Sequence, residues 1–445
     1  MSSTRPALFV LAAVASIGVA LACGPDFPWQ LFDSRASTVR APVELSFAFE
    51  IKRLAPTRSD NFVAVEPDEF YDPQNPEVAA AERQEAQSGI WTSILPAETT
   101  LSTSRLLWKL EAARRAENGK EALIAGEGLP VAVLDYIAGA IEFRAGQLDT
   151  AKKYFEAIDR LPPPLRQIRT VAAAYMLGRI QQLEGRLDDA RNSFQTVRAR
   201  ARAGAPDPLG LAVASLGEEA RIDLVEAGLQ KVPWNVPKLD ILDAKAGTLI
   251  GRAVRLYFEQ AARGSKIGFL SLREVAGLLA NNHRNSLTHA IPDPLVRQLL
   301  VAYVVSRDYE FSLTDQLIST GILVDSQDQA TSVIDAVLTQ PNPAGDDLDR
   351  LAALAYQVAR YDLAEKLTAT TERPLGLWVR AKLALRRNDR DAAVRDWTAA
   401  LNATVGAAKL DDDSNARLRG ETTVMIVSEG RYVDSLRMLF PVAQT

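Results

Sequence analysis

The chain has 445 residues, of which 47% are hydrophobic and 24% are charged, so its length suits about three folded domains. Its formal charge of −5 is opposite in sign to the basic excess of nucleic-acid-binding proteins, and we expect no nucleic-acid partner. The single cysteine, Cys23, excludes an intramolecular disulfide.

Residues 1–22 have the pattern of a secretory signal peptide. Arg5 supplies a positive charge, and the residues from Ala7 to Ala22 are apolar or small apart from Ser16. This run is shorter than the roughly 20 residues needed to span a bilayer. It matches the apolar region of a cleaved signal.

The sequence Ala20-Leu21-Ala22-Cys23-Gly24 resembles the lipobox of bacterial lipoproteins, although Ala20 stands where that motif usually has leucine. The resemblance implies cleavage before Cys23 and acylation of that residue, and several acyl chains anchor a protein stably. Because the residue after the cysteine is not aspartate, the resemblance favours the outer membrane of a bacterial cell envelope, with the chain facing the periplasm. The alternative is ordinary cleavage after Ala22, which would release a soluble secreted protein.

Residues 23–100 are expected to form a linker and an N-terminal segment that is partly irregular. Pro42 opens one predicted helix that ends at Leu54. The prolines and acidic residues of 55–76 predict a loop. Its acidic residues lack the spacing of a calcium loop, so we expect no metal there. No later run is apolar enough to span a bilayer, which predicts a mature chain that is tethered only by its lipid anchor.

From Leu101 onward the pattern is helical, with glycine and proline between the helices, and the fold class is predicted to be all-α. The pattern Gly-x-Leu-Asp-x-Ala-x-x-x-Phe occurs twice, at Gly146 and again at Gly185. We divide this part into repeats at 101–205, an irregular region of helical hairpins at 206–340, and degenerate repeats at 341–445.

The duplicated pattern resembles the tetratricopeptide repeat, a helix-turn-helix unit of about 34 residues with small side chains where its helices touch. The resemblance implies a solenoid of stacked helical hairpins, in which no hairpin buries its apolar face alone. It also implies packing roles for Gly139, Gly146, Ala151, Phe155, Gly178, Gly185, Ala190, Phe194, Ala393 and Trp397. Whether the repeats form one superhelix or two arrays stays open.

In that family the first helix of each repeat lines a concave groove that binds a partner. Carried over to this sequence, the groove candidates are Tyr136, Phe143, Tyr175, Arg179, Gln182, Trp378 and Lys382. Aromatic, cationic and amide groups together suit an extended peptide or a glycan. The alternative is that the aromatic side chains simply fill the space between helices.

The sequence holds no Gly-x-Ser-x-Gly, His-Glu-x-x-His or phosphate-loop motif. The two histidines, His283 and His289, are not three or four residues apart and so do not share a helix face. We therefore expect no catalytic residues, no metal and no cofactor.

These observations favour a lipid-anchored scaffold of the cell envelope that binds a protein or peptide partner and is not an enzyme. The alternative is an outer-membrane lipoprotein that binds a nutrient or a glycan and partners a transporter. A third hypothesis, an envelope hydrolase whose acidic site has no recognisable motif, is less favoured.

Overall fold

The computed structural model describes residues 43–57, 60–65, 76–95, 102–228, 243–281, 284–314, 326–340, 348–403, 412–428 and 430–439. All regular secondary structure within these ranges is helical, which confirms the all-α prediction. The expected signal peptide and Cys23 lie outside them. Among the described helices, none combines the length and the apolar character that a bilayer-spanning segment needs.

The chain divides into two compact units. Unit 1 comprises residues 1–50, 277–292 and 297–445, and unit 2 comprises residues 51–276 and 293–296. The chain thus passes from one unit to the other within α3 and again between residues 276 and 297.

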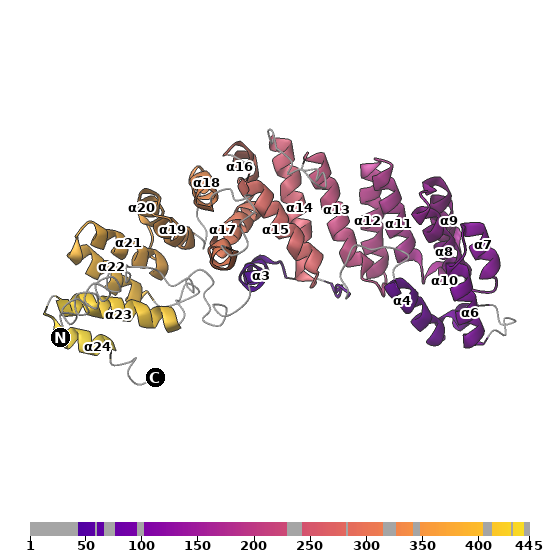
Figure 1. Ribbon diagram of the computed structural model, residues 1–445, viewed down its shortest axis with the longest axis horizontal. Coiled ribbons are helices and arrows are strands. Elements are labelled where there is room, and N and C mark those ends of the chain that lie inside the picture. The colour runs from indigo at the N-terminus through magenta and orange to yellow at the C-terminus, as the bar shows by residue number, and fades with distance from the viewer. Residues whose placement is uncertain are drawn as a thin grey trace, which may run out of the picture. The chain divides into compact units, whose positions relative to one another are not determined.

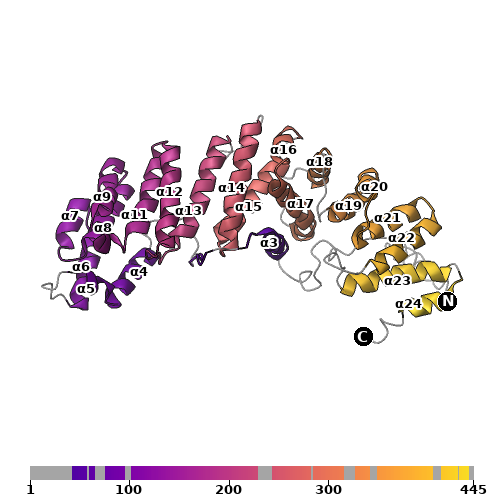
Figure 2. The same cartoon turned by 180° about the vertical axis from the view of Figure 1, so that it is seen from behind.

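Unit 2 contains a series of helices that pack in consecutive pairs, α8 with α9, α11 with α12 and α13 with α14. Figures 1 and 2 show these pairs side by side, and α9 contacts α11 as α12 contacts α13. The helices are α4 (Pro76–Gln87), α5 (Ile90–Ile94), α6 (Thr103–Arg114), α7 (Gly119–Ala125), α8 (Val131–Arg144), α9 (Leu148–Arg160), α10 (Pro163–Arg166), α11 (Thr170–Leu183), α12 (Leu187–Arg202), α13 (Leu211–Glu226), α14 (Ala244–Ala262) and most of α15 (Lys266–Asn281).

The N-terminal segment is more helical than the sequence predicted. One helix was expected in residues 23–100, but α4 and α5 follow it. The stretch of α4 from Val78 to Gln87 is rich in alanine, glutamate and glutamine, which are good helix formers, and it packs against α6. The predicted loop at 55–76 ends where α4 begins. No helix was predicted for the residues that follow it, where local propensity and packing against α6 both favour one.

The α8–α9 and α11–α12 hairpins are built in the same way. A Cβ atom added at Gly139 of α8 would lie 2.8 Å from the ring of Phe155, and one added at Gly178 of α11 would lie 2.7 Å from the ring of Phe194. Both phenylalanines are fully buried. Ala151 and Ala190, which the repeat pattern places at the helix contact, are buried as well. The missing side chain of each glycine lets the second helix place its aromatic ring directly on the first.

Left-handed residues end the first helix of both hairpins. Gly146 and Gly185 each have φ of +74°. The next amide in each turn donates back to the helix, Gln147 to the carbonyl of Glu142 at 2.9 Å and Arg186 to that of Gln181 at 2.8 Å. This bond pattern caps helices at glycine, because only glycine adopts this φ without a steric cost.

Unit 1 contains the first eight residues of helix α3 (Val43–Leu54), up to Glu50, and then the C-terminal helices. Helices α19 and α20, α21 and α22, and α23 and α24 pack in pairs. The C-terminal helices are α16 (Arg284–Ala290), α17 (Pro294–Thr314), α18 (Ser326–Leu338), α19 (Leu348–Gln357), α20 (Tyr361–Thr368), α21 (Pro374–Arg386), α22 (Arg390–Asn402), α23 (Asp412–Ser428) and α24 (Tyr432–Leu439).

Unit 1 repeats the left-handed turn without glycine. Ala359, between α19 and α20, has φ of 61°, and Asn388, between α21 and α22, has φ of 60°. Helix α3 is held to this unit by Phe47, whose ring lies edge-on to that of Tyr303 at 6.1 Å, and by Arg350, which donates to Glu50 at 2.7 Å. In the predicted degenerate repeat, Ala393 and Trp397 of α22 are buried.

Candidate functional site

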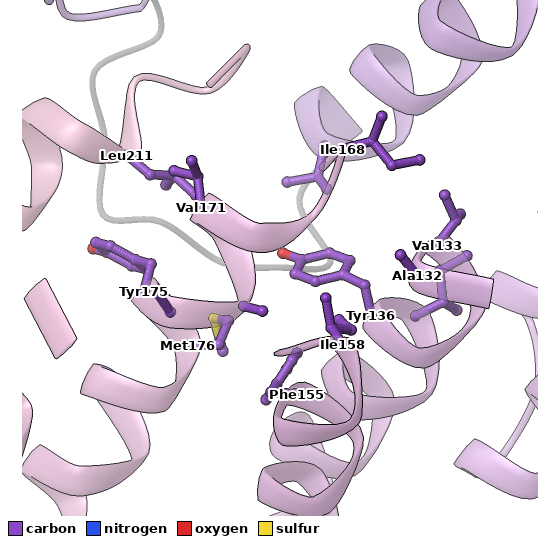
Figure 3. Close-up of a cluster of buried hydrophobic side chains, with 14 of the residues drawn as sticks. Ala132, Val133, Tyr136, Phe155, Ile158, Ile168, Val171, Tyr175, Met176 and Leu211 are labelled. Atoms are coloured by element: carbon purple, nitrogen blue, oxygen red, sulfur yellow. The ribbon is translucent and has the colours of Figure 1, made fainter. Parts of the chain in front are cut away.

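The aromatic groove candidates lie in the core. Tyr136 is 1% exposed, Tyr175 is 2% exposed and Trp378 is fully buried. The ring centroid of Tyr136 lies 5.8 Å from that of Phe155, and that of Tyr175 lies 5.6 Å from that of Phe194. Figure 3 shows Tyr136 and Tyr175 among the aliphatic side chains of neighbouring helices. These aromatics fill interhelical space, as in the alternative interpretation, and a partner does not reach them in this structure.

Lys382 is buried together with Trp378 in unit 1. Its ammonium donates to a carboxylate oxygen of Glu421 at 3.1 Å, while the indole N–H of Trp378 donates to the other oxygen at 2.8 Å. The ammonium also lies 5.7 Å from the centroid of the Trp378 ring. Lys382, which was predicted to bind a partner protein, is thus paired with Glu421 inside the chain. This pairing is needed because a buried charge is stable only when it is paired. Phe143, the remaining apolar candidate, is half-buried against the core of unit 2.

The polar groove candidates Arg179 and Gln182 meet Glu218 on the facing helix α13. The Arg179 guanidinium lies 3.7 Å from one carboxylate oxygen of Glu218, and the Gln182 amide donates to the backbone carbonyl of Glu218 at 3.2 Å. The Tyr175 hydroxyl donates to the same carboxylate at 3.5 Å. We call Arg179, Gln182, Glu218 and Arg221 the α11–α13 face.

The α11–α13 face is accessible to solvent at Arg221, whose side chain is 45% exposed. It lies 3.3 Å from the second oxygen of Glu218 and donates to Gln182 at 3.4 Å. Two guanidinium groups thus share one buried carboxylate. Burial raises the pKa of the Tyr175 hydroxyl, and the negative charge of Glu218 adds to that rise, so Tyr175 stays a neutral donor.

A buried ion network ties α4 to the helix stack. Arg169 donates to both carboxylate oxygens of Glu85, at 3.0 and 2.8 Å, and Trp91 donates its indole N–H to Glu85 at 3.1 Å. Glu82 lies between Arg114, at 2.5 Å, and Arg169, at 3.6 Å. Burial opposes the charge of Arg169, but Glu85 and Glu82 raise the pKa of its guanidinium above the ordinary value.

This network borders a small pocket with a cavity volume of about 20 Å³, which is room for about one water molecule. Glu82, Glu85 and Arg169 line it together with Tyr136 and Asp207. The rest of the wall is apolar, with Val78, Ala81, Ile168, Val171, Ala172, Pro206, Pro208, Leu209 and Leu211. Tyr136, a predicted groove residue, thus borders the pocket in spite of its burial.

Asp207, which also lines the pocket, lies just before α13 in the sequence. Its two oxygens accept the backbone amides of Leu211 and Ala212, each at 2.8 Å. Burial raises the pKa of this carboxyl, and the two amide hydrogen bonds oppose the rise. Asp207 therefore caps the start of α13.

Asp135 of α8 is a half-buried carboxyl near Glu142 and Tyr154. Burial raises the pKa of Asp135 to about 6. Burial also raises the pKa of Tyr154, and the charges of Glu142 and Asp135 add to that rise. Glu142 accepts the amide of Gly119 at 2.8 Å. The negative charge of Asp135 is therefore unfavourable in the folded chain at neutral pH.

We expect Asp135→Asn to stabilise unit 2 at pH 7.5 by at most about 3 kcal/mol, since one pKa unit corresponds to about 1.4 kcal/mol. The folded pKa lies above the unfolded value of 3.8, so Asp135 costs nothing below about pH 4 and destabilises increasingly as the pH rises to about 6. Urea denaturation at pH 4 and pH 7.5 measures this. Asp149→Asn, at an exposed residue, is the control, and an equal gain at both pH values would contradict the assignment.

Among the residues that the structure describes, no group of three or more His, Cys, Asp or Glu side chains is placed to hold a metal ion. His289 is exposed near the end of α16, and His283 lies outside the described residues. The sequence analysis missed Glu82, Glu85 and Arg169. The one available signal was the spacing of the two glutamates, three residues apart on one helix face.

No protein-family model matches the chain. No curated protein matches it either. The function of the chain is therefore inferred from its sequence patterns and from the packing, charge and exposure of the residues described above.

Proposed function

We propose that this chain is a lipid-anchored protein of the bacterial cell envelope that binds a protein or peptide partner through tetratricopeptide-like repeats and does not itself catalyse a reaction. The observation that supports the repeats best is the matched pair of hairpins. Gly139 with Phe155 and Gly178 with Phe194 differ by only 0.1 Å in their closest approach, 2.8 against 2.7 Å. Repeated hairpins present successive similar helices, and such surfaces suit extended partners.

The α11–α13 face is the proposed binding surface of unit 2. It combines an exposed guanidinium with a half-buried guanidinium and amide. The contacts described above within this face are 3.2 to 3.7 Å long, and weak hydrogen bonds are easily exchanged for contacts to a partner. Arginine is enriched at protein interfaces, and it is well suited to recognising carboxylate or backbone oxygens.

The partner is tested by affinity purification of the full chain from detergent-solubilised envelopes. We expect a protein to co-purify in a fixed ratio, and Arg221→Ala, which leaves Arg179 beside the buried Glu218, to reduce its recovery at least tenfold without lowering the melting temperature. Arg160→Ala is the matched control, because Arg160 is an exposed arginine of α9 outside this face. Recovery of a bound sugar and no protein would favour the alternative, a glycan- or nutrient-binding lipoprotein.

The anchor is tested on the same preparation. A fatty-acid probe is expected to label the wild-type chain and to leave Cys23→Ala unlabelled, with that variant released from the membrane fraction. Labelling that persists in Cys23→Ala would contradict lipidation at this residue. Release of the wild-type chain as an unlabelled protein would favour a soluble secreted protein.

A further inference from the structure

The α23–α24 hairpin, the last that the structure describes, has the same turn as the α11–α12 hairpin. Gly430 has φ of +77°, and Gly185 has φ of +74°. In both turns the next amide donates to the carbonyl five residues earlier, from Arg431 at 3.2 Å and from Arg186 at 2.8 Å. Each of these arginines also pairs with the aspartate three residues later. These shared contacts align the two hairpins residue by residue, with Gly430 on Gly185.

One aligned position binds the next hairpin in two other parts of the chain. Arg179 of α11 lies 3.7 Å from Glu218 of α13, and Lys382 of α21 donates to Glu421 of α23 at 3.1 Å. Each of these cations stands six residues before the left-handed residue of its own turn. Val424 has this position in α23. The side of α23 that carries Val424 is therefore the side on which a further helix packs in the other hairpins.

Two more positions of the α11–α12 hairpin bind α13. Gln182 donates to the backbone of α13 at 3.2 Å, and Arg191 donates to Asp223 of α13 at 2.8 Å. Val427 and Leu436 have the aligned positions in α23 and α24. All three α13-binding positions thus hold aliphatic residues in the last described hairpin. A helix that packs on them has to be apolar where α13 is acidic.

These aliphatic side chains are exposed. Val424 and Leu436 are each 67% exposed, and Val427 is 39% exposed. Tyr432 and Val433, at the start of α24, are 64% and 63% exposed. We call these five residues the α23–α24 face. In a stack of helical hairpins the outer side of a terminal unit is normally polar, and a group of exposed apolar side chains marks an interaction surface.

Gly420 leaves space on α23 close to Val424, one helical turn away. It stands at the position that Tyr175 has in α11 and Trp378 has in α21, ten residues before the left-handed turn residue. Those two rings are buried and reach the glutamate of the next first helix. Nothing lies within 4 Å of a Cβ atom added at Gly420. A side chain of a docked helix therefore finds room where the other hairpins place an aromatic ring.

The α23–α24 face is complementary to itself. In the other helices that the structure describes, a large exposed hydrophobic side chain occurs at most once per helix, so this face is the apolar helical surface that the chain itself can offer. Arg431 and Asp434 pair at 2.9 Å beside it, and together they carry no net charge that would repel a second copy. A two-fold axis brings the same patch of both copies together, and homodimer interfaces are rich in apolar residues.

We propose that the α23–α24 face binds the same face of a second copy of this chain. The second copy then supplies the helix that covers Val424, Val427 and Leu436, as α13 covers the aligned residues of the α11–α12 hairpin. This contact belongs to unit 1 and uses no residue of the α11–α13 face. It therefore goes beyond the proposed function and does not depend on it.

The test is sedimentation equilibrium of the purified full chain in a density-matched detergent at increasing protein concentration. We expect a reversible equilibrium between monomer and dimer. Val424→Arg, which introduces the residue that α11 has at the aligned position, should weaken dimerisation at least tenfold, because the dimer would bury an unpaired charge. Ile124→Arg is the matched control, since Ile124 of α7 is 76% exposed and outside this face, and it should dimerise as the wild-type chain does.

Leu436→Glu is the second variant, and it decides the question if Val424→Arg does not fold. We expect it to weaken dimerisation at least tenfold and to leave the circular dichroism of the monomer unchanged, because Leu436 is exposed. A wild-type chain that stays monomeric, or dimerisation that neither substitution weakens, would overturn the proposal. If that monomer bound another protein and Val424→Arg lost it, the face would belong to that protein instead. Dimerisation is measured on the purified chain alone, so its failure is distinguishable from a failed affinity purification.

Discussion

Replacing Arg169 with methionine is expected to lower the free energy of unfolding of unit 2 by about 3–5 kcal/mol. Of the donors to Glu85 described above, the substitution leaves only the Trp91 indole. It also removes one of the two cations beside Glu82. Carboxylates buried without a cation cost much more than the packing that methionine restores. Hydrogen exchange of the amides in α8 and α11, measured against urea concentration, reports the stability of this unit separately.

Two further variants test this explanation. Arg160→Met removes an ion pair with Glu156 in which the arginine side chain is 74% exposed, and it should cost less than about 1 kcal/mol. Adding Glu85→Gln to Arg169→Met should recover part of the lost stability, because one unpaired charge is removed. A loss below about 1 kcal/mol for Arg169→Met alone would show that α4 does not depend on this network.

Phe194→Ala is expected to cost about 3–5 kcal/mol, because it empties the ring position between α11 and α12. Gly178→Ala should also destabilise, by about 1–3 kcal/mol, although alanine favours a helix over glycine by about 1 kcal/mol. The reason is that the added methyl group would lie 2.7 Å from the Phe194 ring, and the hairpin must open to admit it.

The double variant gives the sharper result. Phe194→Ala removes the atoms that the new methyl group would meet, so Gly178→Ala with Phe194→Ala should cost less than the sum of the single variants. Gly420→Ala in α23 is the control, since nothing lies within 4 Å of its added Cβ, and it should be neutral or slightly stabilising. Additive losses would mean that the glycine is not required for the contact between the two helices. Denaturation monitored by hydrogen exchange measures all four chains.

Much of the helical architecture was predictable, because its signals are local. The helical periodicity from Leu101 onward predicted the fold class. Glycines before Leu-Asp predicted the positions where α8 and α11 end, and the structure has left-handed residues there. The repeat pattern also placed Gly139 and Gly178 at helix contacts, where the structure brings them against phenylalanine rings.

The candidate binding site was less predictable, because it depends on contacts between distant residues. The Arg169–Glu85 ion pair joins residues 84 positions apart, and no helix was predicted for the residues of α4. Arg179 and Gln182 were predicted as neighbours on one helix, but Glu218 and Arg221, which complete the α11–α13 face, carry no motif.

The amino-acid pattern alone was sufficient for the helices, their turns and the small residues that allow close packing, since helix period and left-handed φ depend on neighbours within a few positions. Burial of Tyr136, Tyr175 and Trp378 followed only from the arrangement of whole helices. A tyrosine or tryptophan on a helix can line an exposed groove or be covered by a neighbouring helix. Its position in the sequence is the same in both cases, so it does not predict whether the side chain is buried. The distinction comes from α4, α13, α23 and the second helix of each hairpin, which supply the atoms that exclude water from these side chains.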